Sequence, residues 1–129
     1  DSKNEKSALS PRQKEIIAGR ITDVMEGEKP FCSPDFSLGN LAALIDSNTK
    51  YVSLVINEVF KKNFSFFVNE YRVNLACERL AAFDFENYSI EGIGNSVGFR
   101  SGATFASVFK KITGISPSVY KKLAIKKRD

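Results

Sequence analysis

The chain has 129 residues, of which 43% are hydrophobic, which is enough for one core or two small ones. It contains no histidine, so an imidazole base, a Ser-His or Cys-His pair and a histidine metal ligand are excluded. Cys32 and Cys77 have no C-x-x-C spacing and are interpreted as reduced, part-buried thiols, and no glycine pattern suits a phosphate-binding loop. The sequence therefore indicates no catalytic residue, no metal and no cofactor.

The net charge of +4 is unevenly distributed. Residues 1–99 carry 11 Lys/Arg against 14 Asp/Glu, whereas residues 100–129 carry 8 against 1. A basic patch of this kind suits phosphate. For the final IKKRD we favour a solvated tail, but four further lysines lie on predicted helices and are better interpreted as functional: Lys110, Lys111, Lys121 and Lys122.

The N-terminal region is predicted to be a polar lead followed by one amphipathic helix. Residues 1–10 are expected to be disordered or linker-like, and Ser10-Pro11 opens a helix that ends near Gly27. No apolar run approaches the roughly 20 residues of a membrane span. Because the chain lacks both an initiator Met and a signal-like start, we expect it to be a piece of a longer protein.

The next segment predicts a first helix-turn-helix. GEKPFCSPDF forms a connector, Ser37 caps a short helix, and Asn48 caps a second helix over about residues 49–60. A long helix over about residues 65–83 follows. In a DNA-binding helix-turn-helix the second helix, the recognition helix, enters the major groove of DNA. A connecting helix about 28 Å long would let the recognition helices of two such units enter successive major grooves, about 34 Å apart. The inward residues of these three helices are expected to include Leu38, Leu41, Ala42, Leu44 and Ile45, then Val52, Val55, Ile56 and Val59, then Phe67, Tyr71, Ala76, Leu80 and Phe83.

Residues 89–122 predict a second helix-turn-helix. Ile90, Ile93 and Val97 form the buried stripe of its first helix. Gly94 allows a close helix crossing and Gly98 suits a turn with positive φ. The second helix buries Phe105 and Phe109 and ends at Gly114, and Ser116-Pro117 opens the last helix.

Several phenylalanines could be imagined as platforms for stacking bases. Their i, i+4 spacing on inward faces instead favours core packing. This interpretation covers Phe60, Phe67, Phe99, Phe105 and Phe109. Tyr51 and Tyr120 are expected to be buried rings with a solvated hydroxyl, although either hydroxyl could reach a phosphate.

In order and spacing, these residues resemble the AraC/XylS-type transcriptional regulators. The second unit matches closely, through Ile90-x-x-Ile93, Val97-Gly98-Phe99, Phe105, Phe109-Lys110-Lys111, Gly114-x-Ser116-Pro117 and Tyr120. The first unit matches less tightly, through Leu41-Ala42, Tyr51-Val52-Ser53, Phe67, Arg72, Ala76 and Leu80. PFCSPDFSLGNLA is similar to variants found in Bacteroidetes. The resemblance covers about residues 30–122.

The resemblance implies an all-α, homeodomain-like fold with about seven helices plus an N-terminal helix. Residues 1–30 would be the lead and linker helix, 31–64 the first helix-turn-helix, 65–84 the connecting helix and 85–129 the second helix-turn-helix with its basic last helix. It also implies sequence-specific binding of double-stranded DNA, RNA polymerase as a partner, an N-terminal sensor outside this chain, an activator role and a cytoplasmic, nucleoid-associated location, unless the full-length parent is membrane-anchored.

Two positions depart from the family. Ile93-Gly94 stands where Ile-Ala is usual, which costs about 1 kcal/mol of helix propensity. Lys61 stands where a helix-capping glycine is usual. A lysine at positive φ carries about 1 kcal/mol of strain unless the turn differs, and Lys61 could instead be a phosphate ligand.

Carried onto this sequence, the resemblance assigns base-facing positions to both recognition helices. In the first helix these are Thr49, Lys50, Ser53, Leu54 and Asn57, where Lys suits guanine, Asn suits adenine and Leu54 suits a thymine methyl. Lys50 could alternatively contact only phosphate, and Asn57 could be merely solvated. The corresponding residues of the second helix are Gly102, Ala103, Ala106 and Ser107.

The side chains of the second helix are too short for bidentate readout, so we expect this unit to dock mainly through phosphate contacts. The phosphate candidates are Arg100, Ser101, Thr104 and Lys110, together with Lys61 and Lys62 after the first recognition helix. Specificity would then come from the first unit and from DNA shape. The alternatives are a protein-docking module that uses the long helix and an RNA binder that uses the basic end.

Overall fold

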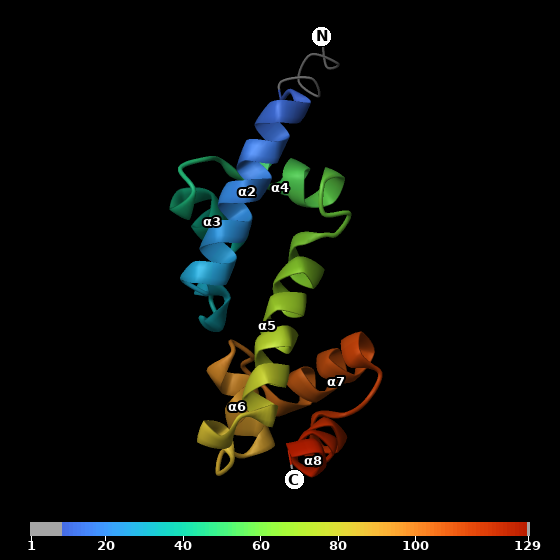
Figure 1. Ribbon diagram of the computed structural model, residues 1–129. Helices are drawn as coiled ribbons and strands as arrows, with labels where there is room; N and C mark the ends of the chain where they lie inside the picture. The colour runs from blue at the N-terminus through green and yellow to red at the C-terminus, as the bar shows by residue number, and fades with distance from the viewer. Residues whose placement is uncertain (1–8, 129) are drawn as a thin grey trace. The chain divides into compact units, whose positions relative to one another are not determined.

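The computed structural model describes residues 9–128, which form seven α-helices and two short 3-10 helices and, within that range, no strand (Figure 1). The all-helical fold class is thereby confirmed. The expectation of a disordered or linker-like lead covered residues 1–10, of which residues 1–8 lie outside the described range. For the last two residues the expectation is wrong, because Leu9 is buried and Ser10 caps the first helix. No described helix combines the length and the apolar character needed to cross a membrane.

The chain divides into two compact units. The first consists of the residues up to Pro30 together with Phe36–Phe67, and the second of Phe31–Asp35 together with the residues from Val68 onward. The short segment Phe31–Asp35 therefore belongs with the C-terminal half of the sequence. Each unit contains one helix-turn-helix.

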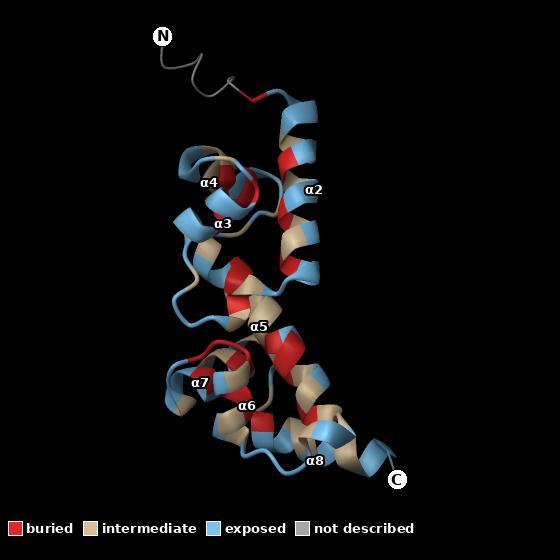
Figure 2. Cartoon of the chain, turned by 90° about the vertical axis from the view of Figure 1, so that its left-hand side faces the viewer, coloured by how far each residue is buried: buried red, intermediate tan, exposed pale blue. Residues whose placement is uncertain are grey.

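The first unit contains α2 (Pro11–Gly27), α3 (Leu38–Leu44) and α4 (Thr49–Glu58). Both α2 and α3 pack on α4. Reciprocal capping boxes begin α2 and α3: the Ser10 and Ser37 hydroxyls accept from backbone N–H groups three residues on, and the side chains there accept in return. The buried positions of α2 recur along one side of the helix (Figure 2).

The second unit contains α6 (Ile90–Ser96), α7 (Gly102–Thr113) and α8 (Pro117–Arg128). The α7 helix packs on both α6 and α8. Ser89 and Ser101 cap α6 and α7, and Gly114 ends α7 at φ 90°. The Ser116 hydroxyl accepts from the Val119 N–H at the start of α8. The end of α7 at Gly114 and the start of α8 at Ser116 agree with the sequence prediction, whereas the caps Ser89 and Ser101 had not been predicted.

The connecting helix is α5 (Phe64–Ala81), preceded by Asn63, whose side chain accepts from the Phe66 N–H. It ends earlier than expected, because Ala82 has extended backbone angles and the chain turns into a short 3-10 helix, η2 (Phe83–Phe85). Phe83 is therefore 75% exposed, and the expectation that it belongs to the apolar face of the long helix is wrong.

The core is mostly as the periodicity predicts. In the first unit Leu41, Val52, Val55 and Ile56 are fully buried, but Leu44 and Val59, also expected inward, are 45% and 42% exposed. Both expectations were wrong: Leu44 lies off the side of α3 that Leu41, Ala42 and Ile45 bury, and Val59 follows the last residue of α4, Glu58.

The phenylalanines pack as core residues. Phe67, Phe99, Phe105 and Phe109 are buried and Phe60 is half-buried. Their rings contact one another in tilted or edge-on pairs, with centroids 4.9 Å apart for Phe60 and Phe67 and 5.6 Å apart for Phe105 and Phe109. The interpretation as packing residues is confirmed. Another short 3-10 helix, η1 (Pro30–Cys32), likewise buries its Phe31.

Candidate nucleic-acid interface

The first helix-turn-helix turns at Asp46, which has φ 55°. Aspartate tolerates this left-handed conformation better than most residues, because its short side chain bonds to nearby backbone. The turn closes through the Ser47 N–H, which donates to the Ala42 carbonyl at 2.8 Å. Asn48 then begins α4, its side-chain oxygen accepting from the Tyr51 N–H at 2.9 Å. Strong local signals thus fix where the first recognition helix starts.

The structure places the five base-contact candidates of the first unit on one helix, α4, whose buried side is made by Val52, Val55 and Ile56. Three of them are exposed and two are half-buried: Thr49, Lys50 and Asn57, then Ser53 and Leu54. This face carries a cation, an amide, two hydroxyls and a branched alkyl group. All are groups that contact base edges in a major groove.

Asn57 has an intrahelical partner. Its amide nitrogen donates to the Ser53 carbonyl at 2.9 Å and lies 3.4 Å from the Ser53 hydroxyl. To bond an adenine with both its oxygen and its nitrogen, the side chain would have to leave this position. The exchange is possible because Asn57 is exposed.

Lys61 does occupy the left-handed region, with φ 60°. The turn after α4 requires this angle because the Lys62 N–H reaches back to the Ile56 carbonyl at 3.3 Å. The strained alternative therefore applies to Lys61, at a cost of about 1 kcal/mol. Its side chain is exposed and that of Lys62 is half-buried. Whether either lysine contacts phosphate remains a prediction.

The second helix-turn-helix turns at Gly98, with φ 115°. A Cβ at Gly98 would collide with the Phe31 carbonyl oxygen and lie 2.6 Å from the Arg72 Nε. Gly94 lies in the crossing of α6 and α7, where a Cβ would come within 2.5 Å of the Phe105 ring. Glycine is required at both positions, in one case by backbone conformation as well as space and in the other by packing alone.

The exposed face of α7 consists of small residues up to Ser107, before the exposed Lys110. Ala103, Ala106 and Ser107 are exposed and Gly102 is half-buried, while Phe105 and Phe109 on the opposite side have no exposed surface. Both base-contact candidates of this unit, Ala103 and Ser107, therefore lie on one open face of the helix. Its side chains reach much less far than those of α4.

The phosphate candidates of the second unit lie at both ends of α7. Ser101 caps the helix by accepting from the Thr104 N–H at 3.0 Å, and its hydroxyl lies 3.3 Å from the Thr104 hydroxyl. In the latter contact the Thr104 hydroxyl accepts from Ser101 and keeps its own proton. Thr104 can therefore donate that proton to a phosphate. Lys110 is exposed in the last turn. Arg100 is exposed as well, but it is paired with Asp35.

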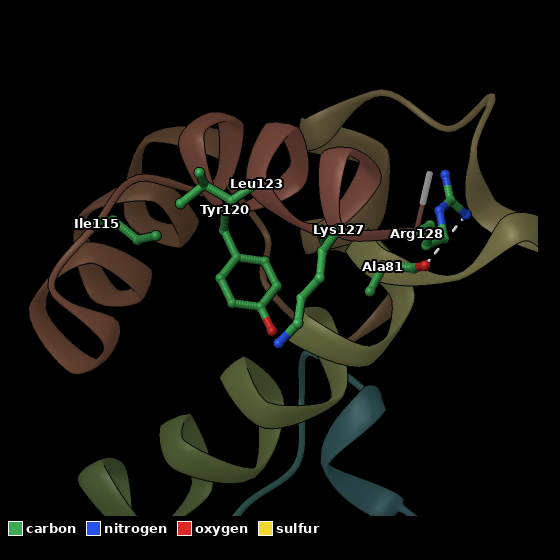
Figure 3. Close-up of a pocket in the computed structure, with 7 residues that line it drawn as sticks. Ala81, Ile115, Tyr120, Leu123, Lys127 and Arg128 are labelled. Carbon is green, nitrogen blue, oxygen red and sulfur yellow. Dashed lines mark hydrogen bonds between the residues drawn. The ribbon is translucent and has the colours of Figure 1, made fainter.

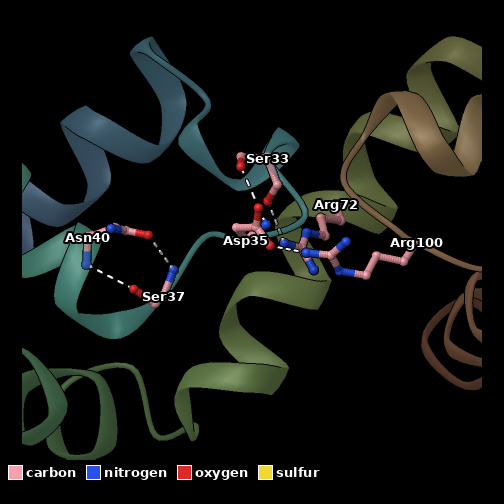
Figure 4. Close-up of polar contacts among 6 residues, drawn as sticks. All are labelled: Ser33, Asp35, Ser37, Asn40, Arg72 and Arg100. Carbon is pink, nitrogen blue, oxygen red and sulfur yellow. Dashed lines mark hydrogen bonds and ion pairs between the residues drawn. The ribbon is translucent and has the colours of Figure 1, made fainter.

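Arg72 fixes the segment that carries Asp35. Its guanidinium donates from Nε to the Phe31 carbonyl at 2.8 Å. It also donates from Nη2 to the Ser33 carbonyl at 3.0 Å (Figure 4). It also lies over the Phe99 ring, 5.7 Å from the centroid. Burial lowers the pKa of Arg72 below its usual value. Sequence reasoning missed the pairing of Asp35, and no local signal could have found a partner 65 residues away.

An apolar groove lies beside α8. It is lined by Ala81, Ile115, Tyr120, Leu123, Ala124, Lys127 and Arg128, and has a volume of about 460 Å³. The polar ends of Tyr120 and Lys127 point the same way in Figure 3. Burial raises the pKa of Tyr120 and also that of Cys77, whose thiol is hydrogen-bonded to Tyr120. Both groups are therefore protonated, neutral side chains at pH 7.

The fold, with the exposed faces of α4 and α7, defines a protein with two helix-turn-helix units. A family model described as a helix-turn-helix domain matches residues 41–123, well over half of the chain. The chain belongs to the AraC-type helix-turn-helix family of DNA-binding transcription regulators, as the sequence resemblance implied. No curated protein sequence matches it.

Solved structures share the fold. A DNA-binding transcriptional dual regulator from Escherichia coli K-12 is 18% identical, with a TM-score of 0.72 over 85% of this chain and 93% of that one. The C-terminal domain of AraT, a response regulator from Geobacillus stearothermophilus, is 24% identical, with a TM-score of 0.68 over 89% and 87%. The DNA-binding domain of the global transcriptional factor AdpA, in complex with a target DNA, is 20% identical, with a TM-score of 0.68 over 87% and 95%.

Proposed function

We propose that the chain binds double-stranded DNA sequence-specifically and that α4 supplies most of the reading of bases. The observation that carries the proposal is the difference between the two exposed faces. Lys50, Leu54 and Asn57 on α4 have side chains that can reach and distinguish base edges, whereas α7 presents mainly Gly, Ala and Ser. Binding would involve no catalytic step.

The division of labour extends to the phosphate contacts. Arg100, Ser101, Thr104 and Lys110 would hold the second unit on the DNA backbone, and Lys61 and Lys62 would do the same for the first. Such contacts fix the register of a protein on the duplex without reading sequence. α5 has 18 residues and so a length of about 27 Å, which supports the proposal that two recognition helices enter successive major grooves.

The wider role follows from the family. The proposed division is residues 31–64 for the first helix-turn-helix, 65–84 for the connecting helix and 85–129 for the second helix-turn-helix. Residues 1–30 would link the first helix-turn-helix to a sensor region. We propose that the parent protein activates transcription in the cytoplasm, in contact with RNA polymerase. The structure of the AdpA DNA-binding domain is a complex with a target DNA, which supports DNA as the partner of this chain too.

The direct test is selection of bound sequences from random duplexes, followed by mobility shifts on the selected and a scrambled duplex at two salt concentrations. We expect a selected motif and affinity that falls steeply with salt. Enrichment without a motif, or affinity that is indifferent to salt, would support a protein-docking module instead. Preferential competition by single-stranded RNA would favour the RNA-binding alternative.

A pair of variants tests the backbone contacts. Lys110→Ala should weaken binding to every duplex by a similar factor and lower the salt slope by about one. Lys126→Ala is the matched control: it removes the same charge from an exposed lysine of α8, in the IKKRD tail that we interpret as solvated. Equal losses in the two variants would mean that net charge, rather than the α7 position, sets the affinity.

A further inference from the structure

An acidic residue from the connector neutralises Arg100 at the start of the second recognition helix. Asp35 Oδ1 accepts from Arg100 Nη2, forming an ion pair (Figure 4). Arg100 directly precedes Ser101, the capping residue of α7. The carboxylate is therefore bonded to a cation at the same helix end as the hydroxyls of Ser101 and Thr104.

Asp35 is held there by a fixed backbone. The two hydrogen bonds from Arg72 tie down the carbonyls of Phe31 and Ser33, and the Asp35 N–H lies 3.4 Å from the Ser33 hydroxyl. The turn glycine Gly98 also lies close to the Phe31 carbonyl, with no space for a Cβ between them. The segment Phe31–Asp35 therefore contacts both Arg72 of α5 and the turn before α7, and these contacts hold Asp35 beside Arg100.

A DNA phosphate would compete for the same guanidinium. Carboxylate and phosphate are both oxyanions that accept hydrogen bonds from arginine. The side chains of Arg100 and Asp35 are 65% and 78% exposed. A pair this exposed is weak and exchanges its partner readily. An approaching phosphate must displace Asp35 before it can bond to Arg100, and the negatively charged carboxylate repels it.

We propose that Asp35 is a positioning residue that restrains Arg100 and so lowers the affinity of the second unit for the backbone of any duplex. The inference deepens the proposed DNA-binding function and rests on it. Contacts to the DNA backbone carry no sequence information. The restraint on Arg100 therefore lowers the non-specific affinity, which is the same for all duplexes. The opposite possibility is that Asp35 stays paired and aims Arg100 at a phosphate.

The test is a double-mutant cycle on duplex binding with Asp35→Asn, Arg100→Ala and both together. Asp35→Asn removes the charge and keeps the shape. It should tighten binding to selected and scrambled duplexes alike, by about two- to five-fold, and steepen the salt slope by up to about one. Arg100→Ala should weaken both, and in its background Asp35→Asn should have little further effect.

The matched control is Glu86→Gln. Glu86 is an exposed carboxylate of the second unit, paired with Arg128 at 3.5 Å, so this variant changes the net charge equally. An equal gain in both variants, or a gain that persists without Arg100, would overturn the inference as an effect of net charge. Weaker binding by Asp35→Asn would overturn it in favour of the aiming role. If neither the wild type nor Asp35→Asn binds duplex DNA, the proposed function fails and the inference fails with it.

Discussion

The two helix-turn-helix units are built on one plan with different side chains. In each, a capping serine begins a seven-residue helix, a residue at positive φ makes the turn, and a polar cap begins the recognition helix. Counted from the caps, Ala42 and Val52 of the first unit correspond to Gly94 and Phe105 of the second. A small and a medium side chain are thus replaced by none and a large one, and the Phe105 ring fills the space that a Cβ at Gly94 would need.

The turns differ as well. The first runs from Ile45 to its cap Asn48, and the second from Val97 to its cap Ser101, so the second is longer by one residue. The extra residue is Arg100. The same unit that lacks long side chains on its recognition face has therefore gained a cation just before the helix, and Asp35 is paired with it. The two cores thus fill the same positions with different side chains, and the exposed residues are the basis for the different roles that we propose for the two units.

The largest expected effect comes from breaking the second turn. Gly98→Ala should lower the free energy of unfolding by about 3 kcal/mol, because the new Cβ collides with the Phe31 carbonyl and the backbone stays at positive φ. Denaturant titration measures this loss.

Gly114→Ala is the control for the turn. Gly114 also has positive φ, but nothing lies within 4 Å of the Cβ that would be added, so only about 1 kcal/mol should be lost. Equal losses in the two variants would show that the contact between Gly98 and the Phe31 carbonyl adds nothing to the cost of the substitution.

An intermediate effect should separate the recognition faces. Lys50→Ala or Asn57→Ala should change the preference between the selected site and its single-base variants by about 1–3 kcal/mol, because each removes a side chain that can bond a base edge. Binding titrations on a panel of duplexes measure the preference.

The corresponding change in the second unit is Ser107→Ala. It should leave the preference nearly unaltered, since a serine hydroxyl contributes no bidentate contact. If Ser107→Ala or Ala103→Gly abolished discrimination while Lys50→Ala did not, the assignment of sequence reading to α4 would be wrong.

The smallest effect concerns the end of α4. Lys61→Gly should raise the free energy of unfolding by about 0.5–1 kcal/mol, because glycine adopts φ 60° without a Cβ penalty. If Lys61 also contacts a phosphate, affinity for all duplexes should fall and the salt slope should drop by about one.

Lys29→Gly is the control for this position. Lys29 is another lysine at positive φ, 51°, and it is not a candidate DNA contact. The variant should gain stability to a similar degree and keep its affinity. An unchanged affinity in Lys61→Gly as well would reduce Lys61 to a strained turn residue.

Local signals in the sequence predicted much of the fold. Ser10, Ser37 and Asn48 cap helices as their side chains predict, and Gly98 lies at positive φ. Such signals are reliable because capping and turn conformation depend on groups within a few residues. The candidate base contacts came from the family resemblance, and they are spaced so that a helix with 3.6 residues per turn places them on one face.

Periodicity predicted less well where burial depends on a neighbour. Leu44, Val59 and Phe83 all occupy apolar positions of a helical pattern, yet all are exposed. The pattern states on which side a residue lies, but it does not state how far the facing element extends. Val59 and Phe83 lie beyond the last residues of α4 and α5, and Leu44 lies off the side of α3 that faces the core.

The sequence by itself determined the family, the helices with their caps, the two turns and the residue types of each recognition face, because these follow from neighbours along the chain. Only the tertiary structure decided the partners of Arg72 and Arg100. Those partners lie 39 to 65 residues away in the sequence, and no periodic or local pattern records such pairs. A guanidinium can bond any oxyanion or carbonyl within reach, so the folded backbone alone selects which oxygen that is.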